Sequence, residues 1–213
     1  ARPELEASAF YIDNPENYKG KWKELFENDN PIHLELGCGK GQFISQLAVQ
    51  NDNVNYIAVD LVDAMLGLAK RNVESTYKEH EKEIKNVFLT RYDIERIANI
   101  FGRDDKIERI YINFCNPWPR GKHHKKRLTH TRQLEKYKQF LKENGEIYFK
   151  TDDDNLFNDS ISYFKSSGFE IIKNTYDLQD EPEFWDNIKT EHEDMFTEQG
   201  IKIKALIARG ITN

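Results

Sequence analysis

Two adjacent patterns between Tyr111 and Arg132 could hold two different parts of a nucleic acid. An apolar run ends at Asn116-Pro117-Trp118, where an amide could pair with a base edge and an aromatic ring could stack on a base. Residues 120–132 then contain six Lys and Arg and no acid, which suits phosphates. Together these patterns predict chemistry on a base within a nucleic acid. The alternatives are a strand-ending turn with a core tryptophan and a solvated charged face.

A glycine motif, Glu35-Leu-Gly37-Cys-Gly39-Lys-Gly41, follows a short apolar run. Glycines at a strand-to-helix turn allow a tight turn and close approach of the backbone to a ligand. A dinucleotide site needs the longer G-x-G-x-x-G spacing, because the pyrophosphate must meet the start of the helix. The Glu35 carboxylate would repel a pyrophosphate but suits a ligand that carries an ammonium and a sulfonium. The motif therefore favours such a ligand over a nicotinamide dinucleotide.

Two further acids, Asp60 and Asp93, follow the next two predicted strands. Asp60 could accept hydrogen bonds from ribose hydroxyls, and Asp93 could accept one from an adenine amine. Three acids at the carboxyl ends of consecutive parallel strands fit the ligand crevice of an open α/β sheet. The alternative is a glycine-rich turn that only packs a helix on the sheet, with surface acids nearby by chance.

Strand and helix patterns alternate along the chain and must position these residues. We expect strands at 32–36, 55–59, 87–89, 109–114, 146–150, 169–175 and 202–208. We expect helices at 41–50, 62–77, 94–101, 134–141 and 156–166, with Asn144-Gly145 as a helix stop. The alternation predicts an α/β fold: one domain, 1–213, with a mostly parallel seven-stranded sheet, helices on both faces and an antiparallel last strand. Residues 1–30 would form an extension laid over the core.

Composition limits the partners of this chain of 213 residues. Its net charge of −6 taken alone argues against nucleic-acid binding. Charges are screened beyond about 8 Å at physiological salt, so the local basic segment matters more than the total. No apolar run approaches the ~20 residues that span a bilayer, and we expect no membrane partner.

The thiols and imidazoles give no sign of a metal site. Cys38 and Cys115 lie in apolar surroundings without the spacing of metal ligands, which favours free thiols in a reducing cytoplasm. His123, His124 and His130 also lack such spacing. We therefore expect no metal cofactor and a cytoplasmic protein.

The reacting segment resembles a known family signature. Phe114-Cys-Asn-Pro-Trp-Pro119, followed by Lys122-His123 and Lys125-Lys-Arg-Leu-Thr129, is similar to that of the bacterial tRNA (guanine-N7)-methyltransferases. The likeness extends over nearly the whole chain, to Gly20-Lys-Trp22, Phe149-Lys-Thr-Asp152 and Thr190-Glu-His-Glu193.

The resemblance implies a Rossmann-like class I methyltransferase fold that uses S-adenosylmethionine and releases S-adenosylhomocysteine. The implied reaction is methylation of N7 of a guanine in the variable loop of tRNA, forming 7-methylguanosine. The implied partner is tRNA, bound by a monomer or homodimer with no obligatory protein partner. Members of the family often begin with a basic arm, which would lie upstream of Ala1.

The resemblance also assigns residues to roles. Cofactor contacts fall, with Gly37 and Gly39 of the glycine motif, on Glu35, Asp60, Asp93 and Asn116. Substrate contacts fall on Arg120, Asp152, Thr190 and Glu193. RNA contacts fall on Lys122, Lys125, Lys126 and Arg127. From the residues alone, Thr190 and Glu193 could instead be a helix N-cap and a first-turn acid.

Two positions depart from the family pattern. Arg120 stands where a Lys is usual, which keeps the charge. Asn116 stands where the family has an Asp regarded as catalytic. Guanine N7 carries an in-plane lone pair and no proton, so its methylation needs no general base. We expect catalysis from Asn116, which orients the base, and Asp152, which compensates the positive charge that develops on the ring.

Two other functions remain open from the residues. The chain could methylate another ring nitrogen or an exocyclic amine, because Asn-Pro-aromatic loops serve both. It could also be a tRNA- or cofactor-binding protein that has lost activity through Asn116.

Overall fold

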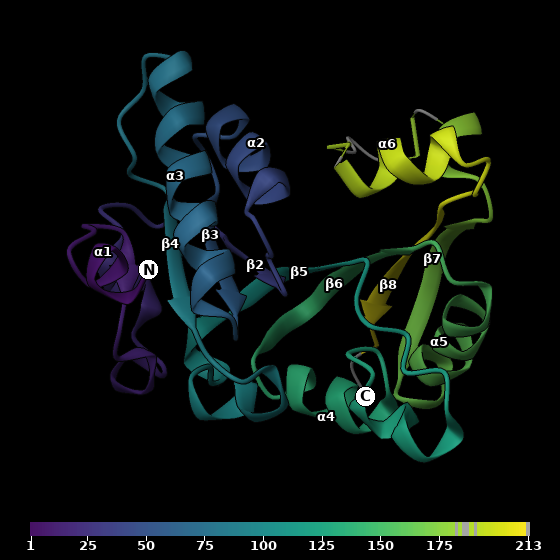
Figure 1. Cartoon of the computed structure of the whole chain (residues 1–213). Coiled ribbons are helices and arrows are strands. Elements are labelled where there is room, and N and C mark those ends of the chain that lie inside the picture. The colour runs from purple at the N-terminus through teal and green to yellow at the C-terminus, as the bar shows by residue number, and fades with distance from the viewer. Residues whose placement is uncertain (182, 185–187, 190, 212–213) are drawn as a thin grey trace.

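A computed structural model describes residues 1–181, 183–184, 188–189 and 191–211. These residues form a sheet with strand order β1-β4-β3-β2-β5-β6-β8-β7 (Figure 1). The strands are β1 (Tyr11–Ile12), β2 (Ile32–Leu36), β3 (Asn55–Asp60), β4 (Val87–Arg91), β5 (Ile107–Asn113), β6 (Leu141–Thr151), β7 (Phe169–Thr175) and β8 (Lys204–Gly210).

The sheet is parallel except for β8, which lies antiparallel between β6 and β7. The predicted mostly parallel α/β sheet with an antiparallel last strand is therefore confirmed. The count differs by one, because β1 pairs with β4 at the edge of the sheet and makes eight strands in the described part of the chain. Two residues are too few to show a strand periodicity, so no pattern in the sequence indicated β1.

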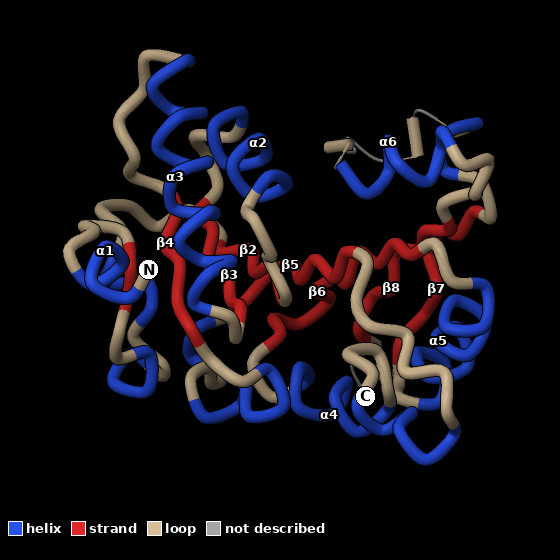
Figure 2. Tube along the Cα trace, in the orientation of Figure 1, coloured by secondary structure: helices blue, strands red, loops and turns tan. Residues whose placement is uncertain are grey.

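Helices cover both faces of the sheet (Figure 2). They are α1 (Arg2–Glu6), α2 (Gln42–Gln50), α3 (Asp63–Glu79), α4 (Thr131–Lys138), α5 (Asp154–Ser166) and α6 (Glu191–Glu198). α2 and α3 lie on one face, and α4 and α5 lie on the other (Figure 1). α6 lies on the same side as α2, beyond β8 and β7 (Figure 1). The described residues contain no helix that is long and apolar enough to cross a membrane.

Two predicted helices differ from the structure. Residues Ile94–Asn99 form a 3₁₀ segment rather than an α-helix. The helix expected at 134–141 runs over Thr131–Lys138, because the His130 ring accepts a hydrogen bond from the Arg132 N–H and caps its start. Asn144, expected at a helix stop, lies inside β6 with a φ of 61°.

Residues 20–22 of the N-terminal extension pack against the residues that follow the 3₁₀ segment. The Trp22 ring is fully buried, stacks on Phe101 at 5.1 Å and donates from Nε1 to the Ile100 carbonyl at 2.6 Å. The Asp105 carboxylate accepts from the backbone N–H groups of Gly20 and Trp22, at 2.8 and 3.1 Å. These bonds fix residues 20–22 on the face of the sheet that α4 covers.

Gly41 is the position where a side chain would disturb the fold most directly. Its φ is +76°, and an added Cβ would lie 2.6 Å from the Ala69 Cβ on α3. We expect Gly41→Ala to lower the free energy of unfolding by roughly 2–5 kcal/mol, because backbone strain and overpacking add. Urea unfolding measures this change. Gly121→Ala is the matched control, since no atom lies within 4 Å of its added Cβ. An equal loss in both variants would contradict the packing argument.

Candidate active site

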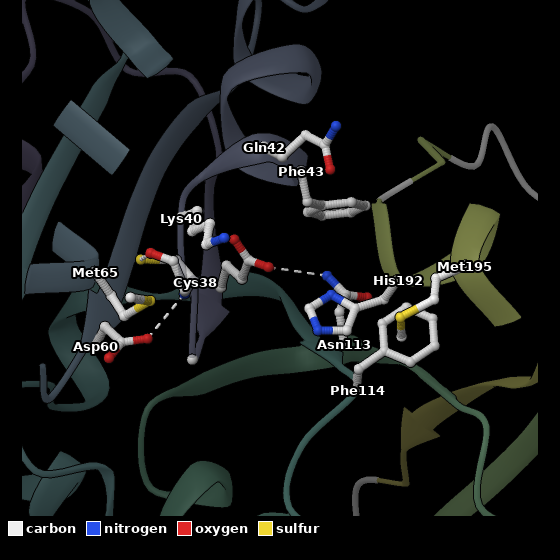
Figure 3. A pocket seen from close by; sticks show the side chains of 13 residues that line it. Cys38, Lys40, Gln42, Phe43, Asp60, Met65, Asn113, Phe114, His192 and Met195 are labelled. Carbon is white, nitrogen blue, oxygen red and sulfur yellow. Dashed lines mark hydrogen bonds between the residues drawn. The ribbon is translucent and has the colours of Figure 1, made fainter. Parts of the chain in front are cut away.

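A cavity of about 420 Å³ opens at the carboxyl ends of β2, β3 and β5 (Figure 3). α2 and α3 supply residues to one side of it, and α6 supplies residues across from α2. Its lining residues are Glu35, Gly37, Cys38, Gly39, Lys40, Gln42, Phe43, Asp60, Met65, Asn113, Phe114, His192 and Met195.

The glycine turn is tied to the end of β3. The N–H groups of Gly37 and Cys38 both donate to the Val59 carbonyl, at 2.8 and 3.1 Å. Gly37 has a φ of +82° and Gly39 one of +53°, a region where residues with a Cβ are strained. The turn therefore presents backbone to the cavity, as the motif predicts.

Asp60 holds this turn and also faces the cavity. Its Oδ2 accepts from the Gly39 N–H at 2.8 Å (Figure 3). Its Oδ1 accepts from the Val62 N–H at 3.0 Å. The carboxylate is thereby fixed at the rim, where its remaining lone pairs can accept from ligand hydroxyls.

Glu35 is a buried acid with an acceptor left open. The residue is 2% exposed, and its Oε2 accepts from Asn113 Nδ2 at 2.9 Å. Its Oε1 is buried and has no hydrogen-bond partner among the described residues. Burial raises the pKa of Glu35 to about 8, against the lowering effects of the Asn113 amide and the Lys150 charge. A ligand ammonium would supply the missing donor and the missing positive charge.

A buried ion pair links the sheet to α6. The Lys150 side chain is fully buried, and its Nζ lies 3.1 Å from Glu193 Oε2 and 3.0 Å from the Ile188 carbonyl oxygen. It also lies 5.0 Å from the centre of the Phe43 ring. Burial lowers the pKa of Lys150, while Glu193 acts to raise it. Because the pair is shielded from water, it fixes α6, and with it His192, beside the cavity.

Phe114 turns the chain sharply at the end of β5. Its φ is +54°, which is unusual for a bulky residue, and its N–H donates to the Lys150 carbonyl at 2.9 Å. The Phe114 ring stacks on the His192 ring at 5.5 Å. Such strained backbone persists where the surrounding contacts impose it, often at functional sites. The turn directs the chain from the cavity toward Asn116.

The structure does not bring every predicted residue into the cavity. Asn116 is exposed, and its Oδ1 accepts from the Trp118 N–H at 3.0 Å. Asp93 accepts from the Glu95 N–H and caps the 3₁₀ segment. Neither side chain lines the cavity. Asp152 is half-buried directly after β6. Thr190 lies outside the described residues.

The basic segment divides into exposed and buried cations. Arg120, Lys122, Lys125 and Lys126 are exposed, as a phosphate contact requires. Arg127 is buried, with its guanidinium 2.7 Å from the Asp159 carboxylate. The predicted RNA contact of Arg127 therefore does not fit the structure, because the charge is already paired inside the protein.

Sequence reasoning missed two polar residues that complete the site. Asn113 holds Glu35, and its signal is an amide at the end of an otherwise apolar strand. Lys150 pairs with Glu193, and its signal is one cation in the apolar run Ile147–Lys150. Neither signal indicates which residue is the partner, because Glu35 and Glu193 lie far away in the sequence.

Comparisons with known proteins agree with this geometry. A family model with the printed description "Putative methyltransferase" matches residues 29–206. A tRNA (guanine-N(7)-)-methyltransferase of Clostridium botulinum (strain Alaska E43 / Type E3) is 60% identical over 98% of this chain and 94% of its own length. One of Clostridium perfringens (strain 13 / Type A) is 56% identical over 98% and 95%. The structure of the 16S rRNA methyltransferase KamB shares the fold, with a TM-score of 0.65 and 12% identity over 90% and 93% of the two chains.

The raised pKa of Glu35 predicts how stability depends on pH. The folded protein keeps the proton up to about pH 8, whereas the unfolded chain loses it near 4.5. The contribution of Glu35 to the free energy of unfolding is therefore complete below the pKa of the unfolded chain. It is lost as pH rises through the pKa of the folded protein. We expect Glu35→Gln, which resembles the protonated acid, to flatten the fall in stability between those two values. Urea unfolding across this pH range tests it, with the exposed Glu79→Gln as control; a slope equal to that of the wild type would refute the burial argument.

Proposed function

Because this chain belongs to the tRNA (guanine-N(7)-)-methyltransferase family, we propose that it transfers a methyl group from S-adenosylmethionine to N7 of a guanine in the variable loop of tRNA. The observation that supports the cofactor most directly is the buried Glu35 carboxylate, whose Oε1 lacks a partner among the described residues. It lines a cavity of about 420 Å³ beside a glycine turn. The sulfonium supplies an electrophilic methyl group, and S-adenosylhomocysteine is left.

The residues of the cavity fit the parts of this cofactor. Glu35 would accept from the amino acid ammonium, whose positive charge favours the ionised acid despite its burial. Asp60, already oriented by two backbone N–H groups, would accept from the ribose hydroxyls. No atom lies within 4 Å of the position that a Cβ would take at Gly37 or Gly39, so the cofactor could approach the backbone there. Asp93 and Asn116 do not line the cavity. Asp93 would contact the adenine and Asn116 the methyl group, where these parts of the cofactor extend beyond the cavity.

The reaction needs positioning more than proton transfer. The N7 lone pair would form the new bond to the methyl carbon as the carbon–sulfur bond breaks, so the residues of the chain would orient the two groups and would transfer no proton. Asn116 would accept from the N1–H or N2–H of guanine and so orient the ring. The amide supplies only a dipole against the cationic product ring. Asp152, half-buried at the end of the neighbouring β6, would supply the negative charge.

Glu193 would take part in guanine recognition as a paired carboxylate. Lys150 Nζ donates to its Oε2 at 3.1 Å. As the family resemblance implies, the Glu193 carboxylate would accept from the Watson–Crick edge of guanine, because a carboxylate can accept several hydrogen bonds. Thr190, which lies outside the described residues, would contribute to the same guanine contact.

Transfer RNA would bind along the exposed cations. Arg120, Lys122, Lys125 and Lys126 lie between the reacting loop and α4, and exposed cations supply the phosphate term of binding. This local patch accounts for tRNA binding by a chain whose net charge is −6.

Methyl transfer to an unmodified tRNA transcript tests the function. We expect label from S-adenosylmethionine to appear as 7-methylguanosine, mapped to the variable loop by nuclease digestion and mass spectrometry. A transcript with adenine in place of that guanine is the matched control. Label on an exocyclic amine would assign a different reaction. Cofactor binding without any transfer would indicate a binding protein.

The charge role of Asp152 has its own test. We expect Asp152→Asn to lower kcat by about tenfold or more, since removing one preorganised electrostatic group typically costs that much. Cofactor affinity measured by calorimetry should stay unchanged. Asp154→Asn is the control, because this nearby acid is 71% exposed and pairs with Lys204. Turnover close to that of the wild type in Asp152→Asn would remove Asp152 from the reaction.

A further inference from the structure

Arg127 differs from the other cations of its segment. Its side chain is only 1% exposed, whereas Lys122, Lys125 and Lys126 are exposed. A buried guanidinium is retained only when its donors are satisfied inside the protein. The contacts of Arg127 therefore indicate what it does.

The Arg127 guanidinium joins the reacting loop to α5. Its Nε donates to the Pro117 carbonyl at 2.7 Å. Its Nη1 donates to Asp159 Oδ2 at 2.7 Å and to the Tyr163 hydroxyl at 3.1 Å. Asp159 and Tyr163 lie on α5, which packs on the sheet. One side chain thus fixes the carbonyl next to Asn116 relative to the core.

Other residues of the segment hold the rest of the loop. His124 Nε2 lies 3.2 Å from the Pro119 carbonyl oxygen. The Trp118 ring lies 4.9 Å from Lys126 Nζ and meets the His123 ring edge-on at 5.7 Å. Trp118 has a φ of 41°, a strained value that such contacts stabilise. The segment therefore faces the loop with one side and solvent with the other.

We propose that Arg127 is a positioning residue that fixes the Asn116-Pro117 loop on α5, while Lys122 and Lys125 carry the phosphate contacts. This inference rests on the proposed methyl transfer. A displacement of about 1 Å at a reacting group can cost roughly a hundredfold in rate. The role needs a planar fork, because donors at two nitrogens must reach a carbonyl on one side and α5 on the other. A lysine would keep the charge and lose this geometry.

Variants of α5 test the role without touching the basic segment. We expect Asp159→Asn and Tyr163→Phe to lower kcat, with Asp159→Asn falling about tenfold or more, while the KM for tRNA and its salt dependence stay as in the wild type. Arg127→Lys should show the same loss of kcat. Lys125→Met is the matched control: it should raise the KM for tRNA and reduce the slope of log affinity against log salt by about one. Thermal unfolding of each variant checks that the fold is retained.

Hydrogen exchange gives a second measurement that does not depend on activity. Loss of the Arg127 contacts should speed hydrogen exchange of the Trp118 N–H, which donates to Asn116. If Arg127→Lys keeps its kcat, or if the Asp159→Asn and Tyr163→Phe variants change only KM and the salt slope, Arg127 is a phosphate contact and the proposal is wrong. An inactive wild type would refute the proposed function instead, and the exchange of Trp118 would still decide the positioning role.

Discussion

The pairing of β2 with both β3 and β5 is the constraint on which the site depends. Leu36 pairs with Val59 on one side and with Ile112 on the other. Asp60 and Asn113, the next residues of those strands, therefore end at the same edge of the sheet. Glu35 lies between them and accepts a hydrogen bond from the Asn113 amide, while Asp60 accepts one from the Gly39 N–H of the glycine turn. Parallel register, rather than any single contact, brings the three polar groups around one cavity.

The buried Lys150 charge acts on two acids of the site, Glu193 and Glu35. The Lys150 ammonium pairs with Glu193 and acts electrostatically on Glu35. One buried cation thus serves an acid at the proposed cofactor site and an acid at the proposed guanine site. A cationic cofactor beside Glu35 would change the field at Lys150, so the two sites share one electrostatic environment.

The features that could be predicted from the sequence are local, and those that could not depend on distant partners. The glycine turn, Asp60 and the main strands follow from spacing and periodicity within short windows. The burial of Arg127 depends on Asp159 and Tyr163, which lie on a later helix. A run of cations looks the same in sequence whether one member faces solvent or the core. The Lys150–Glu193 pair was hidden for the same reason.

The place of β8 in the sheet has a consequence for synthesis of the protein. β8 follows the other described strands in the chain, yet it lies between β6 and β7 and is the strand that pairs with β7. Chains emerge from the ribosome N-terminus first, so β7 stays unpaired until Lys204–Gly210 have emerged. α6 lies between β7 and β8 in the chain. The strands on both sides of it are therefore in the sheet only after β8 has paired with β7. The cavity beside α6 is therefore completed only after β8 has emerged.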